Sequence, residues 1–307
     1  MNSIRPYTGA DEAALLALWA AALPLDALDT AAFRRRVLLD PNVGPESLLV
    51  AESDGQPRGF VLAIRRREPF GDLGLQPEQA WITAFGVDPA HQRQGLGRAL
   101  FDAAEGQLAA AGVRRVAVAP YIPGYFVPGV DEAAYPAALA FLAGRGYEVV
   151  QRPVALDANL VTFDYGPYLE RGARLAAEGL FVEPLAADWL PAFLRFAETD
   201  LPHDWLRDAR DLLAHAPLET FTIARDGARV IGYCQHRGEH FGPFGVSEGY
   251  RARGVGKVLL ATCLRAMRTR GLHNAWVLWT SDETAERVYG PLGFRETRRF
   301  AVLRREL

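Results

Sequence analysis

The sequence has few residues of the kinds that build metal sites or disulfide frameworks. Of its 307 residues only two are cysteines, Cys234 and Cys263, and both lie in apolar surroundings without a CxxC or histidine-rich spacing. Zinc sites and disulfide-stabilised domains depend on such spacings. We therefore expect no metal in the protein and a reducing compartment around it.

Long apolar runs are also missing. The apolar stretch near the N-terminus is preceded by Asp11 and Glu12, and no small-residue cleavage site follows a clean apolar block, as a secretory signal would require. No run approaches the roughly 20 apolar residues that a helix needs to cross a bilayer. We expect a cytoplasmic protein with no membrane partner.

No charge of one sign dominates the chain. The 34 basic and 37 acidic residues give a formal net charge of -3 and are spread along the sequence. A nucleic-acid-binding surface usually shows as a basic patch or stripe, so we expect no nucleic-acid partner. Half of the residues are apolar, which is enough for a substantial core.

What the sequence does contain is a duplication. The segment VDPAHQRQGLGRALF at 87–101 aligns without a gap with VSEGYRARGVGKVLL at 246–260, so that Gly95 corresponds to Gly254. Flanking segments 52–64 and 224–236 also resemble each other, and each predicts a strand, an Asp-Gly turn and a second strand. The spacing between the copies is that of one domain, so we predict two domains, residues 1–167 and 168–307.

Each copy predicts the same order of strands and helices. In the sequence that follows each glycine turn, apolar residues recur at four-residue intervals, which predicts a helix that packs on a sheet. These residues are Leu96, Leu100, Ala104 and Leu108 in the first copy, and Val255, Leu259, Cys263 and Met267 in the second. The predicted fold class is α/β (α+β), and the charged stretch 164–180 is interpreted as a connecting helix.

Each glycine motif is expected to form a turn that binds a phosphate. A strand that leads through residues 92–97, or 251–256, into a helix presents unpaired backbone N–H groups at the positive end of the helix dipole. A P-loop is excluded because Val258 follows Lys257 where a Ser or Thr is needed. A Rossmann fingerprint is excluded because Leu100 and Leu259 stand at its third glycine position.

These motifs resemble the acetyl-CoA signature of the GCN5-related N-acetyltransferase family, and both copies look like members. The resemblance implies two tandem domains, each with a mixed, splayed, mostly antiparallel sheet flanked by helices. It also implies that the strand before each turn pairs with the pantetheine of acetyl-CoA, while the turn holds the diphosphate. The residues implied are Phe85, Gly86, Val87, Gln92, Arg93, Gln94, Gly95, Leu96, Gly97 and Arg98, and Phe244, Gly245, Val246, Arg251, Ala252, Arg253, Gly254, Val255, Gly256 and Lys257.

A late motif distinguishes the copies. In the family an Asn is followed by Ala and then by a Tyr that protonates the departing CoA thiolate or hydrogen-bonds to it. The second copy resembles this motif, with Asp282 at the Asn position, which the resemblance assigns to the cofactor site, and with Tyr289 as the acid. In the first copy Leu142 stands at the Tyr position. A leucine can neither donate a proton nor stabilise a thiolate, so the second copy is better equipped for chemistry. Tyr289 could also be a helix residue that only packs on the sheet.

A general base must remove a proton from the attacking amine. Family members commonly place a Glu on the strand before the glycine turn, and here that strand carries Glu239 and His240 in the second copy. Strand alternation puts these two on opposite faces, so at most one is expected to face the cleft. The alternative is a solvated Glu and an edge-strand His. His203, in a polar segment, is either an acceptor contact or a surface residue.

The first copy has a rigid aromatic loop of its own at residues 120–131, rich in Pro, Gly and Tyr. Such a loop could line an acceptor pocket or seal an interface. The leading hypothesis for the chain is an N-acyltransferase that moves acetyl from acetyl-CoA to an amine of a small molecule or peptide in a ternary complex. The alternatives are a non-catalytic acyl-CoA-binding module and a mycothiol-synthase-like activity. The residues identify neither the acceptor nor the oligomeric state.

Overall fold

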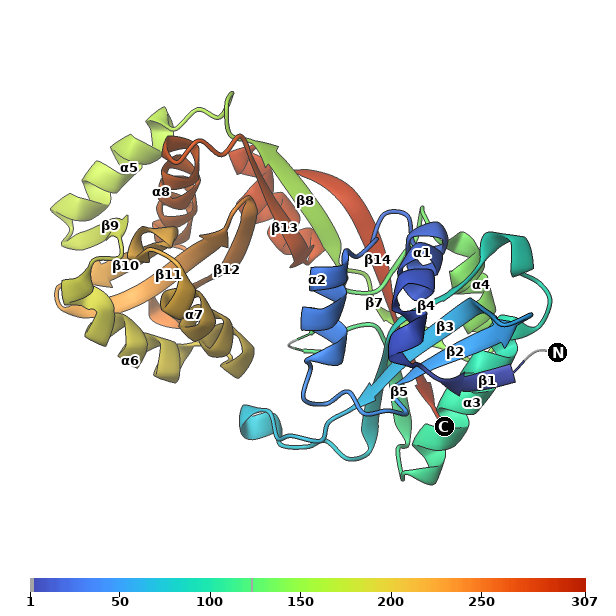
Figure 1. Ribbon diagram of the computed structural model, residues 1–307. Helices are drawn as coiled ribbons and strands as arrows, with labels where there is room; N and C mark the ends of the chain where they lie inside the picture. The colour runs from blue at the N-terminus through green and yellow to red at the C-terminus, as the bar shows by residue number, and fades with distance from the viewer. Residues whose placement is uncertain (1–2, 123) are drawn as a thin grey trace. The chain divides into compact units, whose positions relative to one another are not determined.

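The computed structural model describes residues 3–122 and 124–307, which form two compact units (Figure 1). Unit 1 comprises Met1–Pro153 and Arg299–Leu307, and unit 2 comprises Val154–Arg298. Each unit is a mixed, mostly antiparallel sheet with helices on both faces, which confirms the expected fold class.

The sheet of unit 1 runs in the order β1-β2-β3-β4-β5-β14. Neighbouring strands are antiparallel except β4 and β5, which are parallel. Two short strands, β6 and β7, pair with β14. The strands are β1 (Ser3–Pro6), β2 (Leu48–Ser53), β3 (Gln56–Arg65), β4 (Gln79–Val87), β5 (Arg115–Val118), β6 (Val130–Asp131), β7 (Glu148–Gln151) and β14 (Arg295–Glu306).

Helices cover both faces of this sheet and enclose two cores. One face carries α1 (Glu12–Ala22) and α2 (Thr30–Phe33), which pack on an aromatic core that includes Trp19 and Phe60. The other carries α3 (Leu96–Ala110) and α4 (Pro136–Ala143). The apolar stripe predicted for α3 is buried there, as expected for a helix with one face on a sheet.

Unit 2 repeats this plan in the order β9-β10-β11-β12-β13-β8, with β12 and β13 parallel. Its strands are β8 (Val154–Asn159), β9 (Leu180–Pro184), β10 (Phe221–Asp226), β11 (Arg229–Arg237), β12 (His240–Val246) and β13 (Asn274–Thr280). Its helices are α5 (Gly166–Ala177), α6 (Leu190–Asp200), α7 (His203–His215), α8 (Val255–Thr269) and α9 (Asp282–Thr284). A π-helical turn, Ala285–Tyr289, continues α9.

The last strand of each sequence copy completes the sheet of the other unit. Strand β8, which ends the first copy, pairs with β13 in unit 2, and the C-terminal part of β14 pairs with β5 in unit 1. The units therefore divide the chain at Pro153 and again at Arg298, instead of at the expected boundary between residues 167 and 168. The Gly166-Pro167 break predicts a boundary there, but the strand pairing that decides the division is not visible in the sequence.

The two parallel strands diverge in both units, as a splayed sheet requires. Strands β4 and β5 are paired from Gln79 to Ile82, and the rest of β4 runs on without β5. In unit 2 the recorded pairing of β12 with β13 is confined to His240 and Trp276. The edge of β12 towards Val246 is therefore free of β13, and a 3-10 turn, Glu248–Tyr250, connects it to the glycine turn.

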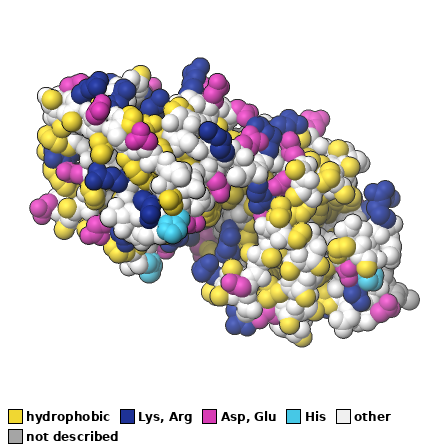
Figure 2. Space-filling model, turned by 90° about the horizontal axis from the view of Figure 1, so that it is seen from above, with side chains coloured by type: hydrophobic (Ala, Val, Ile, Leu, Met, Phe, Trp, Pro, Cys, Tyr) yellow, Lys and Arg dark blue, Asp and Glu magenta, His cyan; other side chains and the backbone are white. Residues whose placement is uncertain are grey.

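On the face drawn in Figure 2, basic and acidic side chains are interspersed instead of gathered by sign. No helix among the described residues is long and apolar enough to cross a membrane.

Candidate active site

The glycine turn of unit 2 has the backbone of an anion-binding loop. Ala252 and Gly254 adopt positive φ angles of 62° and 86°, and Gly254 is the N-cap of α8, a helix of 15 residues. Alternation of left-handed with other conformations turns successive N–H groups to one side, and the helix dipole adds positive potential. The loop can therefore hold a diphosphate at the start of α8.

Unit 1 has the same backbone at the corresponding positions. Arg93 and Gly95 have φ angles of 62° and 87°, and Gly95 is the N-cap of α3. A positive φ is uncommon for a residue such as Arg93 or Ala252. Its recurrence at the same place in both copies shows that both turns have the same local structure.

A cavity of about 900 Å³ opens beside the turn of unit 2. One wall is the turn itself and the end of β12, a second is formed by α6, α7 and their connection, and a third comes from α5 and the segment around α9. The lining residues are Arg171, Phe196, Asp200, Leu201, Pro202, Trp205, Phe244, Gly245, Val246, Ser247, Tyr250, Arg251, Ala252, Gly254, Gly256, Lys257, Thr284, Arg287 and Val288.

The charge of this cavity favours an anion on the side of the turn. Its basic lining residues are Arg171, Arg251, Lys257 and Arg287, against a single carboxylate, Asp200. That carboxylate accepts hydrogen bonds from the hydroxyls of Ser247 (2.8 Å) and Thr199 (2.7 Å). The cations near the turn and the aromatic wall of α6 and α7 divide the cavity into a polar part and an apolar part.

Two glycines of the cavity allow close packing that a Cβ would prevent. A Cβ on Gly245 would lie 3.1 Å from Cζ3 of Trp205, and one on Gly256 would lie 3.2 Å from Cζ of Phe244. Both distances are tighter than ordinary van der Waals contact. The Trp205 ring therefore lies directly against the β12 backbone.

Tyr289 lies beside the cavity, in the π-helical turn. Its side chain is 7% exposed, and its ring packs edge-on against Phe294 and Phe241, with centroids 5.1 and 6.4 Å away. Burial raises the pKa of the phenol well above its usual value, so the hydroxyl stays protonated at neutral pH. Val288, the residue before it, lines the cavity, whereas Tyr289 does not. Asp282 is the first residue of α9, and the Ser281 hydroxyl accepts a hydrogen bond from the N–H of Thr284.

The structure separates the two candidate bases. Glu239 lies in the turn before β12, where its carboxylate accepts hydrogen bonds from the backbone N–H groups of His273 (3.3 Å) and Asn274 (3.1 Å). That carboxylate fixes the start of β13. His240 begins β12, at the point where β12 and β13 are paired, and its ring stacks on Trp276 with centroids 4.2 Å apart.

Burial gives His240 the protonation state of a base. It lowers the pKa of the imidazole to about 4, with a smaller contribution from the positive charge of Arg237. The ring is therefore neutral at pH 7, and the lowered pKa makes it a weaker proton acceptor than an ordinary imidazole. His203, the third titratable candidate, is the exposed first residue of α7.

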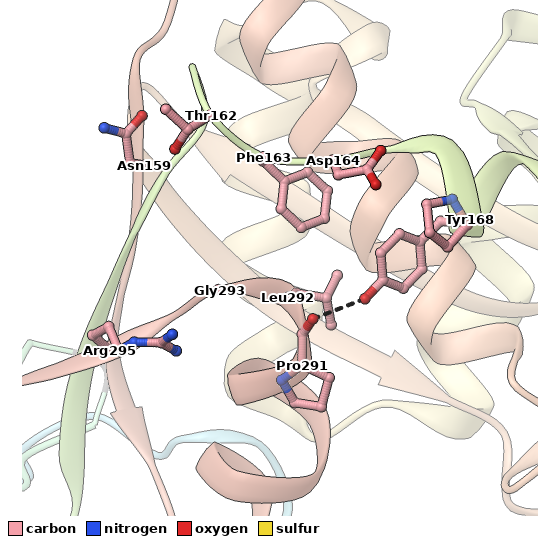
Figure 3. Close-up of a pocket in the computed structure, with 10 residues that line it drawn as sticks. Asn159, Thr162, Phe163, Asp164, Tyr168, Pro291, Leu292, Gly293 and Arg295 are labelled. Atoms are coloured by element: carbon pink, nitrogen blue, oxygen red, sulfur yellow. Dashed lines mark hydrogen bonds between the residues drawn. The ribbon is translucent and has the colours of Figure 1, made fainter.

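Unit 2 also has a second, smaller cavity of about 450 Å³, drawn in Figure 3. It is lined by Asn159, Thr162, Phe163, Asp164, Pro167, Tyr168, Pro291, Leu292, Gly293 and Arg295. Figure 3 shows the Tyr168 hydroxyl directed at the Pro291 carbonyl, to which it donates a hydrogen bond of 3.0 Å. None of the site residues expected from the sequence lines this cavity.

The aromatic loop of unit 1, residues 120–131, begins in the core of that unit. Tyr121 is fully buried, accepts a hydrogen bond from the Asn42 amide (2.7 Å) and donates one to Asp40 (3.1 Å). Further along, Arg36 donates to the Tyr125 carbonyl and lies over the Phe126 ring. Pro123 lies outside the described residues. These contacts hold the loop against the face that carries α1 and α2.

The cysteines of unit 2 are unsuited to covalent catalysis. Cys234 and Cys263 are both fully buried. Burial, and then the neighbouring Cys263, raise the pKa of the Cys234 thiol well above its usual value, and only a thiolate is a good nucleophile. Among residues 3–122 and 124–307, no group of three or more His, Cys, Asp or Glu side chains could hold a metal ion.

Several lining residues of the main cavity are not predicted by the sequence, among them Arg171, Asp200 and Trp205. Arg171 belongs to α5, which the sequence presents as a charged connector, and the other two flank the α6–α7 connection. No motif marks them, because the packing of helices against the turn brings them there.

Comparison with known proteins relates both copies to one family. The model of the Acetyltransferase (GNAT) family matches residues 14–122 and 186–294. A mycothiol acetyltransferase of Clavibacter michiganensis subsp. michiganensis is 28% identical over 275 residues, which cover 85% of this chain and 80% of that protein.

Solved structures show the same fold at low identity. A GCN5-related glucosamine N-acetyltransferase region in a fungal multi-domain β-N-acetylglucosaminidase superposes with a TM-score of 0.81 at 19% identity, over 99% of this chain and 38% of that one. A tandem GNAT protein from the clavulanic acid biosynthesis pathway gives a TM-score of 0.67 at 17% identity, over 100% and 98% of the two chains. This chain thus spans about two fifths of the fungal protein and nearly all of the tandem one.

Proposed function

Since the chain belongs to the Acetyltransferase (GNAT) family and is an N-acetyltransferase, we propose that unit 2 transfers acetyl from acetyl-CoA to a primary amine of a small molecule or peptide. The observation that carries this proposal is the cavity that joins the glycine turn to the wall of α6 and α7. Donor and acceptor can meet there without leaving the protein.

The donor is held by the turn and by the free edge of β12. Backbone N–H groups of residues 253–257, with Arg251 and Lys257 nearby, bind the diphosphate. The pantetheine amides pair with the β12 backbone near Phe244 and Val246, beyond the single recorded pairing with β13. In unit 1 the turn alone is proposed to retain affinity for the diphosphate.

The reaction is direct attack in a ternary complex, because the buried cysteines offer no nucleophile. The amine nitrogen bonds to the thioester carbon, the C–S bond breaks, and the amine loses a proton as the thiolate gains one. His240, which is neutral, is proposed to accept the amine proton directly or through water. Tyr289, which is protonated, is proposed to supply the proton to sulfur. The acetylated amine and free CoA leave.

The acceptor wall is largely apolar and aromatic, with Phe196, Leu201, Pro202 and Trp205 around one carboxylate, Asp200. A second candidate function is acetylation of a mycothiol precursor. It is favoured by the 28% identity to a mycothiol acetyltransferase over most of both chains. A non-catalytic acyl-CoA sensor would use the same turn but would need no acceptor wall.

A free-thiol assay with acetyl-CoA and a panel of amines tests these functions. Thiol release that depends on an amine supports the enzyme, and release that is greatest with the mycothiol precursor supports the second candidate. Binding of acetyl-CoA without release for any amine would support the sensor and reject the proposal. The panel should include small diamines, amino sugars, amino acids and short peptides with free N-termini.

A further inference from the structure

Arg171 lies over the glycine turn of unit 2. The space that a Cβ on Gly254 would occupy is taken by the Arg171 guanidinium. One guanidinium nitrogen, Nη2, is 3.4 Å from the carbonyl oxygen of Arg253, and the side chain lines the main cavity. The cation therefore stands at the place where the donor diphosphate is proposed to bind.

The packing of α5 fixes this position. Leu175 of α5 is 4% exposed in the core that α8 also joins, and a Cβ on Gly172 would touch Cγ1 of Val258 in α8 at 3.4 Å. The Tyr168 hydroxyl at the start of α5 is bonded to the Pro291 carbonyl. Because α5 rests on the helix that begins at the turn, Arg171 is carried to the turn by the fold.

The charge of Arg171 is not neutralised by a neighbouring carboxylate. On the same helix Arg174 lies 3.8 Å from Glu170, and in the turn Arg253 lies 3.1 Å from Glu178. Among the described residues Arg171 has no carboxylate within ion-pair distance, and its recorded partner is the Arg253 carbonyl, at a long 3.4 Å. A full positive charge with one weak contact is available to a ligand.

The corresponding turn of unit 1 has no such cover. Within the part of the chain that the structure describes, nothing lies within 4 Å of a Cβ built on Gly95. The two turns have the same backbone angles, so the difference comes from α5 and not from the turn. Arg171 thus marks the turn of the unit to which we assign turnover.

We propose that Arg171 is a ligand of the donor diphosphate, and that it leaves the Arg253 carbonyl to bind phosphate oxygens when the donor enters. This assignment rests on the function proposed for unit 2. A guanidinium offers a planar fork of N–H donors that matches a phosphate, and charge-assisted hydrogen bonds of this kind are stronger than neutral ones. Arg171 therefore makes unit 2 selective for donors that carry the diphosphate over donors that end at pantetheine.

The test compares Arg171→Ala with Arg174→Ala, a variant that removes the same charge from an exposed position of the same helix. Dissociation constants are measured by calorimetry for CoA and 3′-dephospho-CoA, and the inhibition constant of pantetheine is measured in competition with acetyl-CoA. Arg171→Ala should weaken CoA and 3′-dephospho-CoA by the same factor, about ten- to hundredfold, and leave pantetheine unchanged. Arg174→Ala should change each value less than about twofold. Arg171→Lys should recover part of the loss, because the charge returns without the fork.

Several outcomes would overturn the assignment. Equal affinities of wild type and Arg171→Ala would show that the guanidinium does not bind the donor. A loss limited to CoA would move the contact to the 3′-phosphate, and tighter binding would mean that Arg171 only obstructs the turn. Melting curves identify an Arg171→Ala protein that fails to fold. In that case the affinities of Arg171→Lys for CoA and 3′-dephospho-CoA test the assignment. If wild-type protein bound neither CoA nor 3′-dephospho-CoA, the proposed function itself would fail, and this assignment with it.

Discussion

Each unit has its own glycine turn, and the two turns have the same backbone angles. The units differ in the side chains that lie beside the turn. In unit 1 a Cβ on Gly97 would meet the Phe141 ring, and that ring packs on Phe101 with centroids 5.0 Å apart. At the corresponding place in the late motif, unit 2 has Val288, which lines the open cavity. The two turns therefore have the same backbone, while an aromatic ring lies beside the turn of unit 1 where unit 2 has a valine.

On the face of the unit 1 sheet that carries α1 and α2, side chains are also closely packed. Trp19 and Phe60 are stacked with centroids 4.6 Å apart, and a Cβ on Gly86 would lie 2.7 Å from the Ala22 side chain. In unit 2 the equivalent Gly245 faces Trp205 at the wall of the cavity. Burial of apolar area stabilises unit 1, whereas unit 2 leaves part of its apolar surface open to a ligand.

The largest effect is expected from adding a negative charge at the turn. Gly254→Glu adds a carboxylate where a diphosphate should bind and a side chain at a φ of 86°, so we expect acetyl-CoA-dependent turnover to fall below about 1% of wild type, consistent with losing several charge-assisted hydrogen bonds. Gly95→Glu, the matched change in unit 1, should retain most of the activity. Initial rates of both folded variants test this expectation. The reverse ranking would show that unit 1, and not unit 2, carries the activity.

The variant Tyr289→Phe distinguishes a chemical role of the Tyr289 hydroxyl from a packing role of its ring. Tyr289→Phe keeps the ring between Phe241 and Phe294 and removes only the hydroxyl, so kcat should fall by roughly 10²–10⁴-fold, as expected for lost general-acid assistance. Acetyl-CoA affinity and Tm should barely change. Steady-state kinetics and melting curves measure this. A wild-type rate with chemistry shown to be rate-limiting would leave Tyr289 a purely structural residue.

The Phe141 ring beside the turn of unit 1 predicts a smaller effect. It can be measured in the Gly254→Glu background, where any remaining CoA binding reports on unit 1. Replacing Phe141 by Val, the residue type at the equivalent position of unit 2, should tighten this binding by about tenfold, or about 1.4 kcal/mol. Calorimetry with CoA measures the change. Unaltered affinity in a folded protein would show that the Phe141 ring is not what restricts unit 1.

A separate effect, on stability instead of on binding or turnover, is the pH dependence of unit 2. Because the pKa of His240 falls from an ordinary 6.5 to about 4 on folding, the unfolded chain binds more protons between these values. The contribution of His240 to the free energy of unfolding is therefore complete above pH 6.5 and declines as the pH falls towards 4, by on the order of 3 kcal/mol. Denaturant titrations of wild type and His240→Gln at pH 7 and pH 4.5 test this. Identical pH slopes for the two proteins would contradict it.

Local rules allowed much of the fold to be predicted from the sequence. The turns at Gly95 and Gly254 need positive φ angles, the apolar stripes of α3 and α8 repeat at the period of a helix, and both patterns depend only on neighbours in the chain. The duplication then indicated two similar units, and comparison with the Acetyltransferase (GNAT) family confirmed the resemblance. The contrast between Tyr289 and Leu142 is likewise visible in the sequence itself, because it depends only on aligning the two copies.

Tertiary structure alone decided the rest, because it depends on contacts between segments far apart in the chain. Strand pairing placed β8 in unit 2 and the end of β14 in unit 1. The same kind of long-range contact bound Glu239 to the backbone of residues 273 and 274, stacked His240 on Trp276, and carried Arg171 to the turn. A sequence pattern records which side chain each residue has, but the energy of burying it depends on which distant residue it meets.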